Sequence, residues 1–265
     1  MMGRKEIYVV VMAMLVPVMA QCQRQERRNV AEQPQNVSSS ISYHSNTGAV
    51  LPKERQWHAG QVLTDKDVAE IGIDNCFKAM QIPDDVFKRM NGKSFHDNPY
   101  IKRSDLRYLR LLHRDASGRT LTGEMVCNKA IANDLVDIFR QLYKAKYPIE
   151  RIQLVDDYNA DDELSMRANN TSCFNYRNVP GTRSLSKHSL GKAVDINTLY
   201  NPFVRTRNGR KEIMPATAKR YADRSKSYAY TIHKGDLLYR LFVAHGFTWG
   251  GSWRYSKDYQ HFEKK

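Results

Sequence analysis

Two short segments in the C-terminal half of the chain carry residues that could bind a metal ion. His188 and Asp195 lie on either side of Gly191, and a turn at this glycine can bring both side chains to one point. Near the end of the chain, His261 follows Asp258 by three residues. Catalytic zinc usually takes three protein ligands and leaves one position open, and two histidines with one carboxylate are a common set. The pattern predicts a metal site formed by His188, Asp195 and His261.

A carboxylate beside such a metal can serve as the general base of a hydrolysis. Asp258 could accept a proton from the attacking water without binding the metal itself. Glu263 is the alternative base, because in a strand it would share the face of His261 two residues away. Each motif is weak alone, since most histidines near an acidic residue are surface pairs or satisfied core residues. Their combination favours metal-assisted hydrolysis.

The two motifs resemble those of the zinc D-alanyl-D-alanine carboxypeptidases, which carry SxHxxGxAxD and, later in the chain, D/E-x-x-H. The matching residues are Ser186, His188, Gly191, Ala193, Asp195, Asp258 and His261. The resemblance covers about residues 150–263. It implies that His188, Asp195 and His261 bind Zn²⁺, that Asp258 is the base, and that the substrate is the stem peptide of peptidoglycan. Whether the activity is that of a carboxypeptidase or an endopeptidase stays open.

The same family uses an arginine upstream of the first histidine to stabilise negative charge on the substrate carbonyl. The usual tyrosine-arginine signature is absent here, which leaves Arg167, Arg177 and Arg183. We favour Arg177, because residues 170–177 mix polar and aromatic side chains as a substrate cleft would. Arg167 is the second choice, and a surface arginine with no catalytic role is the alternative.

The N-terminal 20 residues have the pattern of a signal peptide. Arg4 and Lys5 precede the apolar run 7–18, and Ala20 completes a small-residue cleavage site. The run is shorter than the roughly 20 apolar residues of a membrane span. We therefore expect export to the periplasm or cell envelope, with a lipid anchor on Cys22 as a less favoured alternative. Residues 21–60 are polar and predict a flexible tether.

The chain is strongly basic, with a formal net charge of +14. For an exported protein, this excess predicts loose association with anionic wall or membrane surfaces. No nucleic-acid-binding motif occurs, and acidic residues separate the basic ones, so we expect no nucleic-acid partner. A non-catalytic wall-binding protein is the alternative function, although the intact Asp258 argues against it. We expect a monomer.

Apolar spacing predicts the elements that must position the site. A helix is expected over 128–146, with one apolar stripe, and a second over 235–245. The stripe consists of Ile131, Leu135, Ile138, Phe139 and Leu142. Strands are expected at 106–113, 152–155 and 193–196, and a short helical segment at 83–90. The mixture predicts an α+β fold over residues 61–265, a small antiparallel sheet with flanking helices, and catalytic motifs within 150–263.

Besides Cys22, the mature chain keeps three cysteines. They are Cys76, Cys127 and Cys173. Export to an oxidising space permits a disulfide, and we expect Cys76 to pair with Cys127. Because none of the three lies at metal-ligand spacing, small buried thiols are the alternative.

Overall fold

The computed structural model of the chain describes residues 57–265. The predicted signal peptide, Cys22 and nearly all of the predicted tether lie outside these residues. Residues 57–60 already contact the fold: the indole nitrogen of Trp57 donates a hydrogen bond to the Gly123 carbonyl at 3.1 Å, and the Gly60 amide donates to the Thr122 carbonyl at 2.8 Å. Within residues 57–265, no helix is both long enough and apolar enough to cross a membrane.

The largest sheet has four antiparallel strands in the order β1-β4-β3-β2. Its centre is the long pair β3 and β4, which are joined by a short turn. The two strands pair from Leu106 opposite Asn128 to Arg114 opposite Thr120. The predicted strand at 106–113 is therefore confirmed. The strands are β1 Val62–Leu63, β2 Lys78–Met80, β3 Leu106–Arg114 and β4 Thr120–Asn128.

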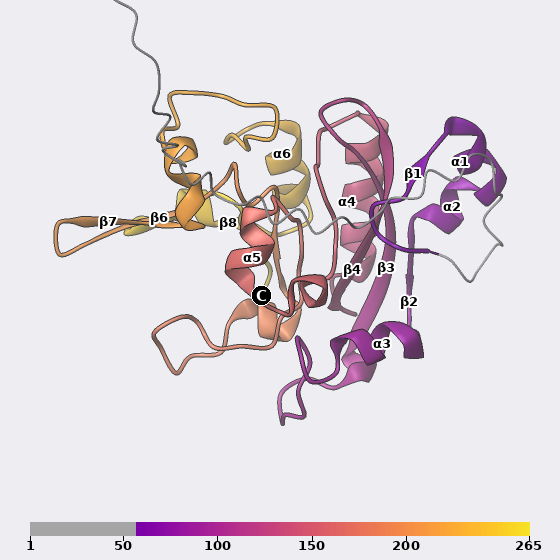
Figure 1. Cartoon of the computed structure of the whole chain (residues 1–265), viewed down its shortest axis with the longest axis horizontal. Helices are drawn as coiled ribbons and strands as arrows, with labels where there is room; N and C mark the ends of the chain where they lie inside the picture. Colours follow the sequence, from indigo (N-terminus) through magenta and orange to yellow (C-terminus); the bar gives the residue numbers. More distant parts are fainter. Residues whose placement is uncertain (1–56) are drawn as a thin grey trace, which may run out of the picture. The chain divides into compact units, whose positions relative to one another are not determined.

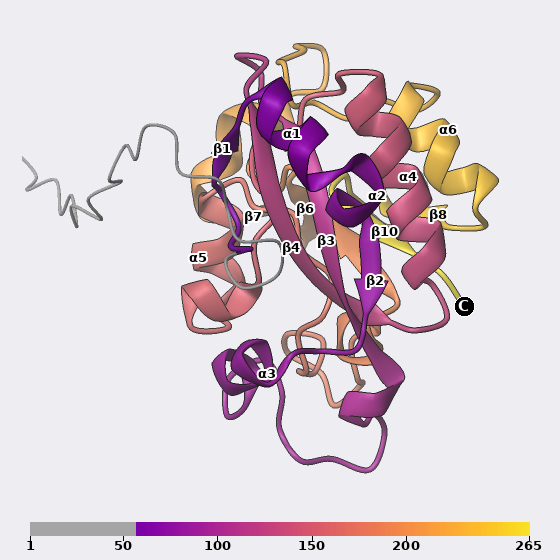
Figure 2. The ribbon, with the colours of Figure 1, turned by 90° about the vertical axis from the view of Figure 1, so that its right-hand side faces the viewer.

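Helix α4 (Ala132–Lys144) packs along this sheet, and α6 (Leu237–Ala244) lies beside it (Figure 2). All five residues of the predicted apolar stripe are buried in the core. The rings of Phe139 and Phe242 join the two helices in an edge-to-face contact with centroids 6.4 Å apart. Both predicted helices are thus confirmed. The remaining α-helices are α1 Asp65–Ile71, α2 Ile73–Cys76, α3 Asp84–Met90 and α5 Asp162–Arg167.

Strand β4 was not predicted, and the helix after it begins at Ala132 rather than at 128. Every residue of β4 is buried, so its pattern shows no polar face. Glu124 in particular resembles a surface residue in the sequence. In the fold, its carboxylate accepts hydrogen bonds from Arg89 at 3.0 Å and from the Tyr108 hydroxyl at 2.7 Å. Such pairing is what a buried carboxylate needs.

The strand predicted at 152–155 is wrong. The Ile152 carbonyl accepts one hydrogen bond from the Glu124 amide at 2.9 Å, but the Gln153 amide donates to the side chain of Asn170 at 3.0 Å. Val155 then begins a 3₁₀ helix that ends at Tyr158. An apolar run is buried here as an extended segment, because side chains replace the partner strand.

The C-terminal half of the chain contains two further sheets, and each has three strands (Figure 1). Their orders are β5-β10-β8 and β7-β6-β9, and all of their pairs are antiparallel. The predicted α+β class is confirmed, although the expected single sheet is divided into three. The strands are β5 Ala193–Asp195, β6 Phe203–Arg207, β7 Arg210–Met214, β8 Thr248–Trp249, β9 Ser256–Asp258 and β10 His261–Glu263.

The expected disulfide between Cys76 and Cys127 is absent. Both thiols, and that of Cys173, are free and buried. All three belong to one apolar cluster, where they pack as small hydrophobic side chains.

His113 makes stability depend on pH. It is buried in β3, where its Nδ1 donates to the Ile149 carbonyl at 2.7 Å. Burial lowers its pKa to about 4, below the ordinary 6.5. Between these values the unfolded chain binds a proton that the folded chain does not, so the free energy of unfolding should fall as the pH drops through this window. The loss attributable to His113 should reach about 3 kcal/mol near pH 4.

Urea unfolding of the parent and of His113→Asn at several pH values tests this prediction. Asparagine can keep the donor to Ile149 but does not titrate, so the variant should lose less stability between pH 6.5 and pH 4. Identical pH dependence in both proteins would contradict it.

Candidate metal centre

Strands β5 and β10 bring Asp195 and His261 together. The two residues are direct partners in an antiparallel pair, so their side chains share one face of the sheet. The neighbouring positions on the opposite face, Val194 and Phe262, are fully buried and join the apolar core. Alternation along two short strands thus sends the polar pair toward the site and the apolar pair into the core.

His188 comes from a short 3₁₀ helix, Lys187–Leu190, that precedes β5. The Ser186 hydroxyl caps this helix by accepting from the His188 amide at 3.2 Å. Gly191 ends it with a φ of +63°, and an added Cβ there would lie 2.6 Å from the amide nitrogen of Asn128. Only glycine fits both requirements. The turn at Gly191 therefore packs closely against the end of β4.

The predicted ligands converge. One ligand atom from each of His188, Asp195 and His261 lies within 4.8 Å of the others. The two oxygens of Asp195 lie 3.2 Å from His188 Nε2 and 3.0 Å from His261 Nδ1. The two ring nitrogens are 3.3 Å apart. Both histidines are buried. The spacing predicted from the sequence is thus realised as one compact group.

The outward ring nitrogens are held by other acceptors. His188 Nδ1 donates to the Cys173 carbonyl at 2.7 Å, and His261 Nε2 is paired with the Glu263 carboxylate at 3.1 Å. These contacts place a proton on the outer nitrogen of each ring and leave the inner nitrogen as a lone-pair donor. Metal-binding histidines are oriented in this way in proteins, so the donor set fits a divalent cation.

The electrostatics of the cluster also favour a cation. Burial raises the pKa of Asp195, but His188 and His261 outweigh it and hold the pKa well below its usual range. For His261, burial lowers the pKa, while the hydrogen bonds to Asp195 and Glu263 prevail and raise it to about 10. Two carboxylates therefore surround this imidazole and stabilise positive charge at the centre.

Asp258 lies beside the cluster but outside the ligand group. It ends β9, and a Cβ added to Gly250 would lie 2.9 Å from Asp258 Cβ and 3.3 Å from His261 Cβ, so the two side chains flank this glycine. Burial raises the pKa of Asp258 to about 6. Its Oδ1 is shielded from solvent and has no hydrogen-bond partner among residues 57–265. A free carboxylate oxygen with a pKa near neutrality suits a general base.

Glu263, the alternative base, has a different position. It contacts the outer nitrogen of His261, whereas Asp195 faces the inner one. The hydrogen bond to His261 lowers the pKa of Glu263. Glu263 therefore orients a histidine, and Asp258 is the better candidate for proton transfer.

The structure does not place the guanidinium of Arg177 on the metal ligands. Its backbone amide donates to the Ser189 hydroxyl at 2.7 Å, and its carbonyl accepts from the Ser186 amide at 3.1 Å, so the backbone adjoins the His188 segment. The half-buried side chain forms an ion pair with Asp162 of α5. Arg167, the second choice, pairs with Glu163 on the same helix at 3.0 Å.

Two further contacts are made by the site histidines, and the first was missed in the sequence. The Cys173 carbonyl orients His188, but a backbone acceptor leaves no side-chain pattern to detect. The second is the ring of Trp253, which lies 5.3 Å from that of His261, centroid to centroid. Trp253 is partly exposed, so its ring flanks His261 on a side that solvent can reach.

Comparison with known families agrees with this geometry. Residues 180–264 match the model of a family described as D-alanyl-D-alanine carboxypeptidase. Over this segment the chain is similar to that family. It contains His188, Asp195, Asp258 and His261, and so confirms the resemblance that the motifs predicted. Arg177 precedes the matched segment, and its role stays a prediction. No curated protein and no solved structure matches the chain.

Gly250 offers a test of how tightly the site is packed. In Gly250→Ala, the new methyl group would lie 2.7 Å from the Asp258 carbonyl oxygen as well as against Asp258 Cβ. Because the nearest atom is backbone, β9 must shift, and we expect the free energy of unfolding to fall by about 1–3 kcal/mol. Urea denaturation measures it. The exposed neighbour Ser252→Ala is the control and should change stability by less than about 0.5 kcal/mol. Equal stability of both variants would contradict the tight contact.

Proposed function

We propose that this chain is an exported zinc-dependent peptidase that hydrolyses peptide bonds in peptidoglycan stem peptides, as a carboxypeptidase or endopeptidase of the D-alanyl-D-alanine carboxypeptidase type. The observation that supports it most is the convergence of His188, Asp195 and His261 within 4.8 Å, with each imidazole oriented by a separate acceptor. The family match over residues 180–264 supports the reaction class.

Zn²⁺ is the ion that best suits two imidazoles and one carboxylate with a position left open. His188 Nε2, His261 Nδ1 and an Asp195 oxygen would hold it. When bound, it supplies a Lewis acid that polarises the peptide carbonyl and makes the attacking water more acidic. The protein supplies the orientation of the three ligands and a cation-stabilising field from Asp195 and Glu263.

Two side chains near this centre have separate roles in the proposed reaction: one transfers protons and the other stabilises negative charge. Asp258 takes a proton from the attacking water and passes it to the leaving amine. Its raised pKa makes both steps feasible near neutral pH. Arg177 is proposed to stabilise negative charge on the carbonyl oxygen, which requires its guanidinium to turn from Asp162 toward the substrate.

The remaining parts of the proposal concern where the protein works. The predicted signal peptide supports export to the periplasm or cell envelope, with lipid anchoring through Cys22 as the less favoured route. The net charge of +14 supports loose attraction to anionic wall or membrane surfaces. Stem peptides are the proposed partner, and the protein is proposed to act as a monomer without nucleic acid.

Metal analysis of the purified protein tests the centre. We expect about one zinc per chain, with most of it lost in His188→Ala and His261→Ala. Glu263→Gln should retain a ligand set but weaken zinc affinity by about 10–100-fold, because it alters the group that orients His261. Competition with a fluorescent chelator measures these affinities. Full zinc occupancy in the His188→Ala/His261→Ala double variant would place the metal elsewhere.

Replacement of the base separates an enzyme from a wall-binding protein. Asp258→Asn keeps the size of the side chain but removes the proton acceptor, so zinc content should persist while kcat on soluble stem peptides falls by about 10²–10⁴-fold. Asp258→Glu should be milder, because it restores a carboxylate with a longer reach. The measurement is release of the cleaved peptide or amino acid by chromatography.

Glu263→Gln at saturating zinc is the matched control, because it alters the other nearby carboxylate. It should keep measurable turnover. If Asp258→Asn instead matched the parent rate while zinc-loaded Glu263→Gln was inactive, the two roles would be reversed. If the parent itself cleaved no stem peptide, the wall-binding alternative would replace the proposed function.

A further inference from the structure

The sheet β7-β6-β9 continues outward from the proposed base. Phe203 of β6 pairs directly with Asp258 of β9, and Arg205 pairs with Ser256. Direct partners in an antiparallel pair share one face, and alternate residues along a strand return to that face. Phe203, Arg205 and Arg207 therefore lie on the same face of this sheet as Asp258.

The hairpin between β6 and β7 extends this face beyond β9. Arg207 pairs with Arg210 across a two-residue turn in which Asn208 and Gly209 have φ values of +50° and +72°. Positive φ at both central residues is the geometry of a type I′ turn, which matches the twist of the strands and makes the hairpin well defined. Arg207 follows Phe203, the residue opposite Asp258, by four positions, a distance of about 14 Å along the strand.

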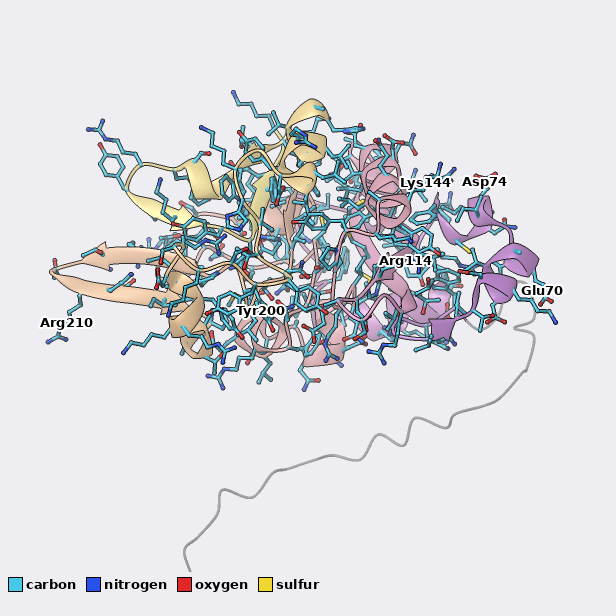
Figure 3. All side chains as sticks on the ribbon, turned by 90° about the horizontal axis from the view of Figure 1, so that it is seen from above. Glu70, Asp74, Arg114, Lys144, Tyr200 and Arg210 are labelled. Atoms are coloured by element: carbon cyan, nitrogen blue, oxygen red, sulfur yellow. The ribbon has the colours of Figure 1, made fainter. Side chains whose placement is uncertain are left out.

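Charge is distributed unevenly along this hairpin. The Arg205 guanidinium is neutralised by its cross-strand partner Glu212, with a nitrogen to oxygen distance of 2.6 Å. The side chains of Arg207 and Arg210, here called the arginine pair, form no hydrogen bond or ion pair with any residue in 57–265, and both residues are exposed. Figure 1 shows that the hairpin projects from the rest of the domain, and Figure 3 shows Arg210 at its far end.

Like charges directly opposite each other in a sheet destabilise it. The turn residues and the register account for the hairpin itself, so the arginine pair adds a cost to folding without a structural benefit. Because the two arginines are direct partners, their side chains leave the sheet on one face, the face that leads to Asp258. Guanidinium groups bind carboxylates through paired hydrogen bonds, and an exposed pair can bind an acidic ligand at little desolvation cost.

We propose that the arginine pair binds carboxylate groups of peptidoglycan strands at a point away from the bond being cleaved. The inference rests on the proposed function and adds the substrate class to it: the preferred substrate is the polymeric wall, whose stem peptides repeat their acidic groups, and not an isolated peptide. The pair holds a neighbouring stem peptide while another occupies the metal centre.

Co-sedimentation with purified peptidoglycan tests the binding directly. The peptidoglycan is first freed of attached phosphate polymers, so that carboxylates are its acidic groups. At low salt, Arg207→Gln/Arg210→Gln should bind about tenfold more weakly than the parent, the combined effect expected of two exposed charge contacts. The difference should vanish near 1 M NaCl, where screening acts within about 3 Å. Arg207→Lys/Arg210→Lys should retain part of the binding.

The matched control is Lys78→Gln/Lys144→Gln, which removes the same charge from exposed positions on β2 and α4. It should bind within about twofold of the parent, since nonspecific attraction changes little when a small part of a net charge of +14 is removed. When the carboxylates of the peptidoglycan are amidated, the parent and the arginine double variant should bind it equally weakly. Three results would overturn the proposal. Both double variants could lose binding equally, or the arginine double variant could bind as well as the parent. The third is a loss of binding that appears only when phosphate polymers are attached.

Hydrolysis of a short soluble stem peptide keeps this proposal distinct from the proposed function. The arginine double variant should cleave it within about twofold of the parent, because the ligand of the pair is a neighbouring stem peptide, which this short substrate lacks. Absence of cleavage by the parent would refute the peptidase, while the sedimentation result would still decide whether the arginine pair binds the wall.

Discussion

The site depends on one register, in which Asp195 of β5 faces His261 of β10. A slip of one residue would turn one of the two side chains to the opposite face. Each strand has only three residues, so the register needs support from outside the pair. Ser172 provides it on the free edge of β5, where it exchanges backbone hydrogen bonds of 3.0 and 2.9 Å with Asp195. The Ile196 amide continues the ladder to the Gln260 carbonyl at 3.1 Å.

The core reinforces the same register from the other face of the sheet. Phe262 alternates with His261 and is fully buried, with its ring 4.5 Å from that of Phe242 on α6. It also pairs with Trp249 of β8. Moving His261 therefore requires moving a large aromatic side chain out of a packed interior, which costs several kcal/mol, roughly the price of a cavity of that size. The helices that cover the sheet thereby contribute to the precision of the metal ligands.

Carboxylates that look alike in the sequence acquire different properties around this centre. Asp195 lies between two imidazoles that keep it ionised, whereas burial raises the pKa of Asp258 to about 6. Glu263 is bonded to the outer nitrogen of His261, and its pKa is lowered. These environments suit the three carboxylates to the different roles proposed for them: metal binding for Asp195, proton transfer for Asp258 and orientation of His261 for Glu263. The positions of these three carboxylates in the sequence do not predict how their pKa values differ.

The sequence alone was enough to predict the candidate residues of the metal centre, the helices α4 and α6 and the α+β class, because local spacing encodes them. His188 and Asp195 are linked by a glycine turn, and the stripe of α4 repeats at helical spacing. Tertiary structure alone decided the rest. The all-buried β4 shows no alternation, since Glu124 is satisfied by Arg89 from a distant helix. The Cys173 carbonyl and the position of Asp258 likewise depend on contacts between segments far apart in the chain, which residue spacing does not record.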